Sequence, residues 1–283
     1  MGYLHINNLY KEKDILLFKR CYAMNKIHGT SAHVSWKEGQ IHYFSGGEKH
    51  ESFKKLFNED ELISKMKEHG VDFTVYGEAY GGKCQGMSKV YGPNLRFVAF
   101  DVQIGDNWLD VPRAEAFVRT LGLDFVDYVE VETDLELLNT IRDSDCPQAI
   151  RNGMGTGHKR EGVVLRPLIE LTKNNGQRVI CKHKRDDYKE TATPRAVSEE
   201  ELAVLTEATA IADEWVTEMR VTHILDKVEG GATIDKMGTI IQMMFDDVKR
   251  EGEGEIVWSK EAERAVKTKA AILVKRRLMK VKE

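Results

Sequence analysis

The sequence has few cysteines, few prolines and no long apolar run, and each shortage excludes a class of protein. Its 283 residues include four cysteines, Cys21, Cys84, Cys146 and Cys181, which lie far apart and form no CxxC pair. We therefore expect neither a zinc site nor a disulfide framework. The five prolines and the lack of low-complexity tracts argue against long disorder. No apolar run approaches the roughly 18 residues that a membrane helix needs, so we expect no membrane partner.

The chain also lacks an excess of positive charge. Its formal net charge is −4, from 42 Lys+Arg and 46 Asp+Glu. Any binding of nucleic acid must therefore come from local basic patches. Residues 1–14 do not show the basic and then apolar layout of a signal peptide, and we expect a reducing, cytoplasmic location.

Composition and periodicity divide the chain near residue 194. Before this point, short runs of β-branched and aromatic residues are bounded by Gly, Asp, Asn or charge, which is typical of strands. These runs are residues 33–36, 73–76, 97–102, 162–165 and 179–181. Helices are expected between them over residues 52–69 and 112–121.

After residue 194 the apolar spacing becomes helical. Ser198 opens a capping-box pattern, and apolar residues at three- or four-residue spacing continue to residue 219. The same spacing recurs over residues 234–248, and a third helix is expected from Ser259 to Val281.

The segment Asn25–Thr30 contains Lys26 three residues before Gly29. Taken alone, K-x-x-G is common by chance, and its ordinary interpretation is an exposed lysine before a turn glycine. Four further patterns follow it in order. Glu78 ends a strand, Phe100 lies within another, Glu161 precedes a buried strand, and a strand ends in Lys182 and Lys184. Residues two apart in a strand share a face, so the last two lysines are expected to point the same way.

This ordered set resembles the covalent nucleotidyltransferase superfamily of ATP-dependent ligases and mRNA capping enzymes, over about residues 20–190. The form Lys-Ile-His-Gly-Thr is similar to the RNA ligase 2 family, whereas ATP-dependent DNA ligases usually carry Asp before the glycine. The resemblance implies an α+β fold. An antiparallel-sheet nucleotidyltransferase domain, ATP-grasp-like, would span residues 1–194, and a small all-α domain would span residues 195–283.

A lysine nucleophile requires help from its surroundings. A free lysine has a pKa of about 10.4 and is almost entirely protonated near neutral pH. One positive charge about 4 Å away, at an effective dielectric of about 20, costs about 4 kcal/mol, which corresponds to about three pKa units. Lys182, Lys184 and a bound Mg²⁺ are candidates for this role, and Glu161 is the best candidate ligand for the metal.

The resemblance implies a three-step reaction. Lys26 attacks the α-phosphate of ATP, forms a phosphoramide and releases pyrophosphate. AMP then passes to an RNA 5′-phosphate, and a 3′-hydroxyl displaces it to seal the strand. The implied cofactors are ATP, as a substrate, and Mg²⁺ or Mn²⁺. The implied partner is RNA with 5′-phosphate and 3′-hydroxyl ends, and no protein partner is expected.

The resemblance also implies a nucleotide site. Its members are Met24, Asn25, Lys26, Ile27, Glu78, Phe100, Glu161, Lys182 and Lys184. Glu78 would bind the ribose hydroxyls and Phe100 would stack on adenine. Glu161 would hold the metal, and Lys182 and Lys184 would contact the α-phosphate as catalytic partners of the nucleophile. Each role has an ordinary alternative. Glu78 would be a solvated charge at a strand end, and Phe100 would be a core ring. Glu161 would form a surface pair with Arg160, and the two lysines would lie at a solvated sheet edge.

The chain departs from the RNA ligase 2 pattern at several positions. Ser31 stands where Asn is common, and no Arg occurs between Cys21 and Leu95, although Lys49 is a possible substitute. His28 is assigned no catalytic role. The glycine-rich segment 152–157 lacks the Lys-Ser/Thr of a P-loop, so we expect a flexible loop.

The last segment is basic. Residues 260–283 carry nine basic residues, Lys260, Arg264, Lys267, Lys269, Lys275, Arg276, Arg277, Lys280 and Lys282, against three glutamates. We expect an RNA contact along the helix from Lys260 to Lys282. A solvated helix face is the ordinary alternative.

Two other functions remain open. A DNA ligase or a GTP-using capping enzyme also forms a lysine–nucleotide bond, but the helical second domain and the histidine before Gly29 count against both. A nucleic-acid-binding protein with an inactive ligase fold is the non-enzyme alternative. The intact Lys26, Glu161, Lys182 and Lys184 count against it.

Overall fold

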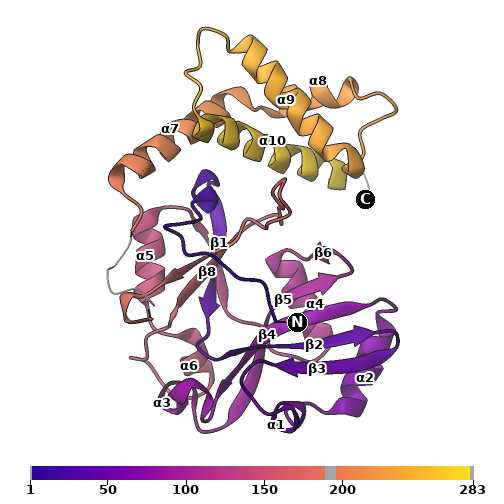
Figure 1. Cartoon of the computed structure of the whole chain (residues 1–283), viewed down its shortest axis with the longest axis vertical. Helices are drawn as coiled ribbons and strands as arrows, with labels where there is room; N and C mark the ends of the chain where they lie inside the picture. Colours follow the sequence, from indigo (N-terminus) through magenta and orange to yellow (C-terminus); the bar gives the residue numbers. More distant parts are fainter. Residues whose placement is uncertain (1, 189–195, 281–283) are drawn as a thin grey trace. The chain divides into compact units, whose positions relative to one another are not determined.

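The computed structural model describes residues 2–188 and 196–280, which form two compact units (Figure 1). The first unit comprises Met1–Ile15 and Arg20–Pro194, and the second comprises Leu16–Lys19 and Arg195–Glu283. The assignment of Leu16–Lys19 to the second unit was not predicted from the sequence. The predicted boundary at residue 194 lies outside the described residues.

The first unit contains a four-stranded antiparallel sheet with the strand order β7-β1-β8-β9. Its strands are β1 (Arg20–Lys26), β7 (Tyr128–Glu132), β8 (Gly162–Pro167) and β9 (Cys181–Lys184). Because β1 lies between β7 and β8, five of its seven residues are buried. The predicted strand at residues 179–181 begins only at Cys181.

A five-stranded antiparallel sheet, ordered β3-β2-β4-β5-β6, completes the β-structure. Its strands are β2 (Thr30–Lys37), β3 (Gln40–Ser45), β4 (Phe73–Gly81), β5 (Leu95–Ile104) and β6 (Asn107–Trp108). The β2–β3 hairpin turns through Glu38 and Gly39, which both have positive φ, as a two-residue hairpin turn requires. The two sheets share one apolar core, to which β1 contributes Tyr22 and Met24.

Six α-helices connect the strands of the first unit in its described part. They are α1 (His50–Lys54), α2 (Glu59–Glu68), α3 (Ser88–Tyr91), α4 (Val111–Thr120), α5 (Leu135–Asp143) and α6 (Pro147–Arg151). Helix α4 agrees with the prediction, and the Asp110 side chain caps it by accepting a hydrogen bond from the Arg113 amide.

The single helix expected over residues 52–69 is instead the pair α1 and α2. The chain leaves the helical conformation at Asn58, which precedes three acidic residues in the first turn of α2. An asparagine followed by acidic residues favours a new helix start. Leu56 and Phe57, in the connection, still pack against the core, which explains why the apolar spacing continues across the break.

The second unit is helical in its described part. It contains α7 (Glu199–Trp215), α8 (Glu218–Asp226), α9 (Met237–Glu251) and α10 (Lys260–Lys280). The capping box of α7 is confirmed, because Ser198 and Glu201 exchange hydrogen bonds. The Ser259 hydroxyl caps α10 by accepting from the Ala262 amide, and residues 281–283 lie outside the described part.

The predicted helix to residue 219 ends early. Val216 is extended, and Thr217 caps the separate helix α8, which was not predicted.

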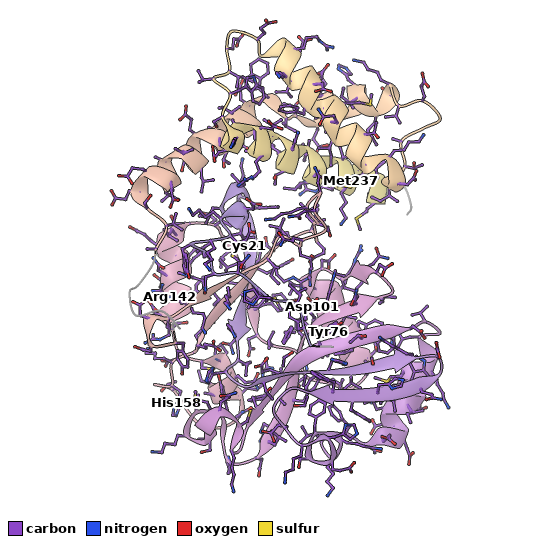
Figure 2. All side chains as sticks on the ribbon, in the orientation of Figure 1. Cys21, Tyr76, Asp101, Arg142, His158 and Met237 are labelled. Carbon is purple, nitrogen blue, oxygen red and sulfur yellow. The ribbon has the colours of Figure 1, made fainter. Side chains whose placement is uncertain are left out.

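None of the helices described is long and apolar enough to span a bilayer. All four cysteines are buried and form no disulfide (Figure 2 labels Cys21 on β1), and burial raises the pKa of the Cys21 thiol to about 12.

Candidate active site

The nucleophile candidate Lys26 is the last residue of β1, and a glycine close behind it permits a tight approach between the two sheets. Gly29 joins β1 to β2. A Cβ atom at Gly29 would lie 2.3 Å from the Ala79 carbonyl oxygen and 2.9 Å from Cγ of Glu78, both on β4. The motif glycine therefore lets Glu78 come close to the segment that carries Lys26.

A second glycine separates Lys26 from Lys184. Lys26 pairs with Gly162 across β1 and β8, and Gly162 pairs with Lys184 across β8 and β9. Opposed residues in a sheet share a face, so the two lysines lie on one face, and Gly162 between them contributes no side chain. A Cβ at Gly162 would lie 2.3 Å from the His183 carbonyl oxygen.

Glu161, immediately before Gly162, occupies the space between these cations. Its Oε2 lies 3.1 Å from Nζ of Lys26 and 3.3 Å from Nδ1 of His28, and its Oε1 lies 3.1 Å from Nζ of Lys184. The Glu161 side chain is only 3% exposed. Arg160 turns away and donates hydrogen bonds to the Ser144 hydroxyl and the Asp145 carbonyl, so a surface pair between Arg160 and Glu161 is not what the structure contains.

These contacts decide the charge of Glu161. Burial alone would raise its pKa, because it removes the carboxylate from water. The hydrogen bond with His28 and the charges of Lys26 and Lys184 outweigh burial and lower the pKa to about 2. Glu161 is therefore a carboxylate throughout the physiological range and holds Lys26 as an ion pair.

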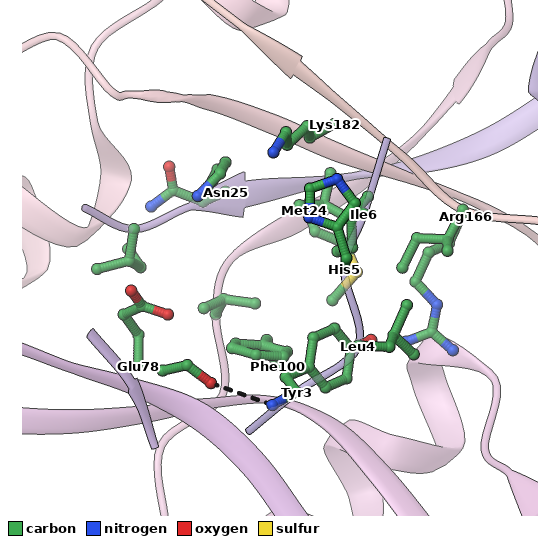
Figure 3. A pocket seen from close by; sticks show the side chains of 16 residues that line it. Tyr3, Leu4, His5, Ile6, Met24, Asn25, Glu78, Phe100, Arg166 and Lys182 are labelled. Carbon is green, nitrogen blue, oxygen red and sulfur yellow. Dashed lines mark hydrogen bonds between the residues drawn. The ribbon is translucent and has the colours of Figure 1, made fainter. Parts of the chain in front are cut away.

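Lys26 also lines a cavity of about 380 Å³ within the first unit (Figure 3). Seven of the nine residues predicted for the nucleotide site line it, namely Met24, Asn25, Lys26, Ile27, Glu78, Phe100 and Lys182. In Figure 3, Glu78 and Phe100 face Asn25 and Lys182 across the cavity. Glu161 and Lys184 are not part of the lining; they connect to it through Lys26.

Glu78 enters the cavity from the other sheet. It lies on β4, opposite Ser31 on β2 and Val98 on β5. Burial raises the pKa of Glu78 to about 7, with Lys26 acting in the opposite direction and Glu161 adding to the rise. The two glutamates near Lys26 thus differ sharply, because Glu161 has cations on both oxygens and Glu78 does not.

Phe100 reaches the cavity because β5 contains a bulge. Tyr76 pairs with Asp101, but the next residue, Gly77, pairs with Ala99, so Phe100 is the extra residue. Bulges commonly redirect a side chain at functional sites. Phe100 lines the cavity and also packs against the core. Its position therefore agrees both with a ring of the nucleotide site and with an ordinary core ring.

Several lining residues were not predicted. Tyr3, Leu4, His5 and Ile6 form one wall, and Arg166 contributes another part. The first four carry no motif, and the hydrogen bond from Tyr3 to Asp101 spans 98 positions of sequence. Ser31, at the position where the family commonly has Asn, also lines the cavity.

Beside the cavity lies a buried network of four charges that joins the two sheets. Arg166 on β8 pairs with Asp101 on β5 at 3.0 Å and with Glu170 at 2.6 Å. Arg178 pairs with the same two carboxylates, each at 2.6 Å. The two arginines and Asp101 are at most 2% exposed, and Figure 2 labels Asp101 in the first unit. Arg166 is therefore already neutralised where it lines the cavity.

The basic residues of α10 differ in exposure, and Lys275 is half-buried. Lys267 pairs with Glu263 at 2.6 Å, and Lys269 pairs with Asp213 at 2.7 Å. The side chains of Lys260, Arg264, Arg276 and Arg277 are exposed. Lys282 and the side chain of Lys280 lie outside the described part.

Comparisons with known proteins show a family match and a structural likeness. The family profile described as RNA ligase matches residues 19–184, more than half of the sequence. Naegleria gruberi RNA ligase, with pyrophosphate and as a lysine-to-methionine mutant with AMP and Mn, is similar at 16% identity and a TM-score of 0.52. Each comparison covers 66% of this chain and 57% of that one. The chain thus spans little more than half the length of that ligase.

A search of curated protein sequences finds no match. The structural likeness confirms the predicted α+β fold with antiparallel sheets. By the profile match over residues 19–184, the chain belongs to the RNA ligase family.

Proposed function

We propose that the chain is an ATP-dependent RNA ligase that forms a covalent bond between Lys26 and AMP. One observation carries the proposal: Lys26, on the wall of a nucleotide-sized cavity, is paired through Glu161 with Lys184. A cavity of about 380 Å³ falls within the usual range for small-molecule sites. Naegleria gruberi RNA ligase is described with ATP and Mn and with AMP and Mn, which agrees with these cofactors.

In the first step, the Lys26 ammonium gives one proton to water, the resulting amine attacks the α-phosphorus of ATP, and the nitrogen gives a second proton to water as the phosphoramide forms. A P–N bond forms, the bond to the bridging oxygen of the β-phosphate breaks, and pyrophosphate leaves. Lys182 lines the cavity and can neutralise charge that builds up on the α-phosphate. Lys184 is 3.1 Å from Glu161 and outside the lining, so we assign it to holding Glu161 rather than to the phosphate.

Glu161 is suited to hold Mg²⁺. Among the described residues, no three His, Cys, Asp or Glu side chains form a ready-made metal site. Magnesium at nucleotide sites usually takes one or two carboxylates and completes its shell with phosphates and water, so a single glutamate fits. When bound, the metal supplies positive charge to the phosphates. Glu161, once shared with such a cation, holds the Lys26 ammonium less tightly.

The later steps concern RNA. AMP passes from Lys26 to an RNA 5′-phosphate, and a 3′-hydroxyl then attacks that phosphate and releases AMP. We propose that residues 1–194 carry the adenylation chemistry and that the exposed basic residues of α10 contact the RNA backbone. Phosphate contacts of this kind give affinity without sequence preference.

The decisive experiment uses enzyme freed of AMP and ATP labelled at the α-phosphorus, with Mg²⁺. We expect acid-stable label on the protein and release of pyrophosphate. Label from GTP in place of ATP would favour a capping-type enzyme. No adduct with either nucleotide would leave the inactive ligase fold as the better explanation.

A second assay identifies the strand. We expect the protein to seal nicks or structured ends in RNA faster than the matching DNA nick. Faster sealing of DNA would favour the DNA ligase alternative, while the adenylation step would stand.

A further inference from the structure

A segment near the beginning of the sequence lies, together with Ile180, between two cavities of the first unit. We define the strap as Tyr3–Leu9. Leu4 and His5 line both the cavity that contains Lys26 and a second one of about 300 Å³. The strap is therefore a single layer of chain, with space on both sides.

The first anchor of the strap is Tyr3. Its hydroxyl donates to Asp101 Oδ2 at 2.6 Å and accepts from Arg178 at 3.0 Å. Its ring packs edge-on against Phe100, with centroids 4.8 Å apart, and against Trp108 at 5.6 Å. Tyr3 thus supports the Phe100 ring, which lines the cavity. Hydrogen bonds to Asp101 and Arg178 of the buried charge network hold Tyr3 itself in place.

The second anchor lies at Lys182. The Lys182 amide donates to the Asn7 carbonyl at 2.8 Å, and the Leu9 amide donates to the Lys182 carbonyl at 2.9 Å. Asn8 and Lys182 form a parallel β-bridge. The strap therefore fixes the backbone from which the Lys182 side chain enters the cavity.

We propose that the strap is a working wall of the nucleotide site, with Tyr3 as a positioning residue for Phe100 and with Asn7 and Leu9 fixing Lys182. One end of the strap sets the surface for the base, and the other end sets a phosphate contact. A bound adenine nucleotide would touch both ends at once and hold the strap in place. This inference rests on the proposed function, because it concerns the same nucleotide.

The first test measures adenylation kinetics of the full chain with Tyr3→Ala and Tyr3→Phe. The alanine variant removes the ring and the hydroxyl, so we expect its KM for ATP to rise about tenfold, equivalent to about 1.4 kcal/mol, with a smaller change at saturating ATP. The phenylalanine variant keeps the ring contact with Phe100 and should fall between alanine and wild type.

Tyr43→Ala is the matched control. Tyr43 packs against Phe53 and Phe57 in the same unit and lines neither cavity. If Tyr3→Ala raises the KM for ATP no more than Tyr43→Ala does, Tyr3 does not position the nucleotide.

The second test needs no variant and no catalysis. Hydrogen exchange of the wild-type strap is compared with and without α,β-methylene-ATP, which cannot transfer AMP. We expect slower exchange at the Leu9 amide and its neighbours when the analogue is bound. Unchanged exchange in the presence of bound analogue would overturn the role of the strap while leaving ligase activity intact. Failure of the wild type to form an adduct with ATP would instead count against the proposed function.

Discussion

Two glutamates near Lys26 have opposite environments, and this difference sets what each substitution should do. Glu161 contacts Lys26, His28 and Lys184, while Glu78 lies in the cavity wall without a comparable pair. The contrast concerns single side chains, so it is best tested one residue at a time.

Replacing Lys26 should remove adenylation completely. Lys26→Ala lacks the amine, and Lys26→Arg keeps a positive charge near Glu161 but offers a poor nucleophile. We expect neither variant to acquire label from α-labelled ATP. Label that persists in either variant would place the nucleophile elsewhere.

Glu161→Gln should destabilise the protein near neutral pH. The folded-state pKa of about 2 lies below the ordinary value of 4.5, so the ionised carboxylate stabilises the fold above pH 4.5 and this stabilisation is lost as the pH falls toward 2. We expect a loss of about 3 kcal/mol in the free energy of unfolding at pH 7, from about 1.36 kcal/mol per pKa unit, and a smaller difference near pH 3. Denaturant titrations at both pH values provide the measurement. A pH-independent difference would argue against the ion pairs.

Glu78→Gln should have the opposite effect. The pKa of Glu78 is raised from 4.5 to about 7, so ionisation costs stability as the pH rises through this range. Because Glu78 lies on a cavity open to solvent, we expect the variant to gain only about 1 to 2 kcal/mol above pH 7 and nothing below pH 4.5. The same variant should bind ATP more weakly. A variant less stable than wild type at pH 8 would contradict the assigned environment.

The site residues that could be predicted from the sequence are those that belong to motifs. The resemblance to the RNA ligase 2 family placed Lys26, Glu161 and Lys184 in one site, and in the structure both lysines contact Glu161. Tyr3 could not be found this way, because its hydrogen bond to Asp101 spans 98 positions and leaves no periodic pattern.

At the scale of elements, irregularities carry more information than regular strands and helices. The bulge at Phe100 and the break between α1 and α2 both interrupt patterns that looked continuous in sequence. Apolar spacing reports which residues face the core, and it does not report whether the backbone between them stays regular. The sequence predicted β2, β4, β5, β8 and β9, and it missed β1, β3, β6 and β7 together with the helices α3, α5, α6 and α8.

The α10 helix gives a prediction of its own. Arg276→Glu combined with Arg277→Glu should weaken RNA binding and make the affinity less dependent on salt, by about one counterion for each phosphate that these side chains no longer neutralise. Adenylation by ATP should be unchanged. Lys249→Glu combined with Arg250→Glu, on the exposed surface of α9, makes the same charge change as a control. Equal weakening by both pairs would point to net charge rather than to RNA binding on α10.

For the whole molecule, the net charge of −4 conceals an uneven distribution of charge. Positive groups gather at the candidate site and along α10, and the four-charge network joins the two sheets through Arg166 and Asp101. A net charge of −4 requires that any binding of nucleic acid come from local basic groups. The structure shows where such groups lie, which composition does not contain.

Breaking the four-charge network should therefore destabilise the first unit. Arg178→Met leaves Glu170 with fewer partners and exposes part of the charge of Asp101 to an apolar surrounding. Removing one member of a buried ion pair usually costs about 3 to 5 kcal/mol. Chemical denaturation should show this loss, and a cost below about 1 kcal/mol would mean that the remaining charges repair the network.

The glycines beside Lys26 add a consequence for sequence variation. A methyl group at position 29 would collide with the Ala79 carbonyl, and one at position 162 would collide with the His183 carbonyl. The motif K-x-x-G is common by chance, but in this protein its glycine, Gly29, occupies a space that admits a hydrogen atom and not a methyl group. In a library randomised at positions 29 and 162, glycine alone should survive selection for sealing, and even alanine should be eliminated.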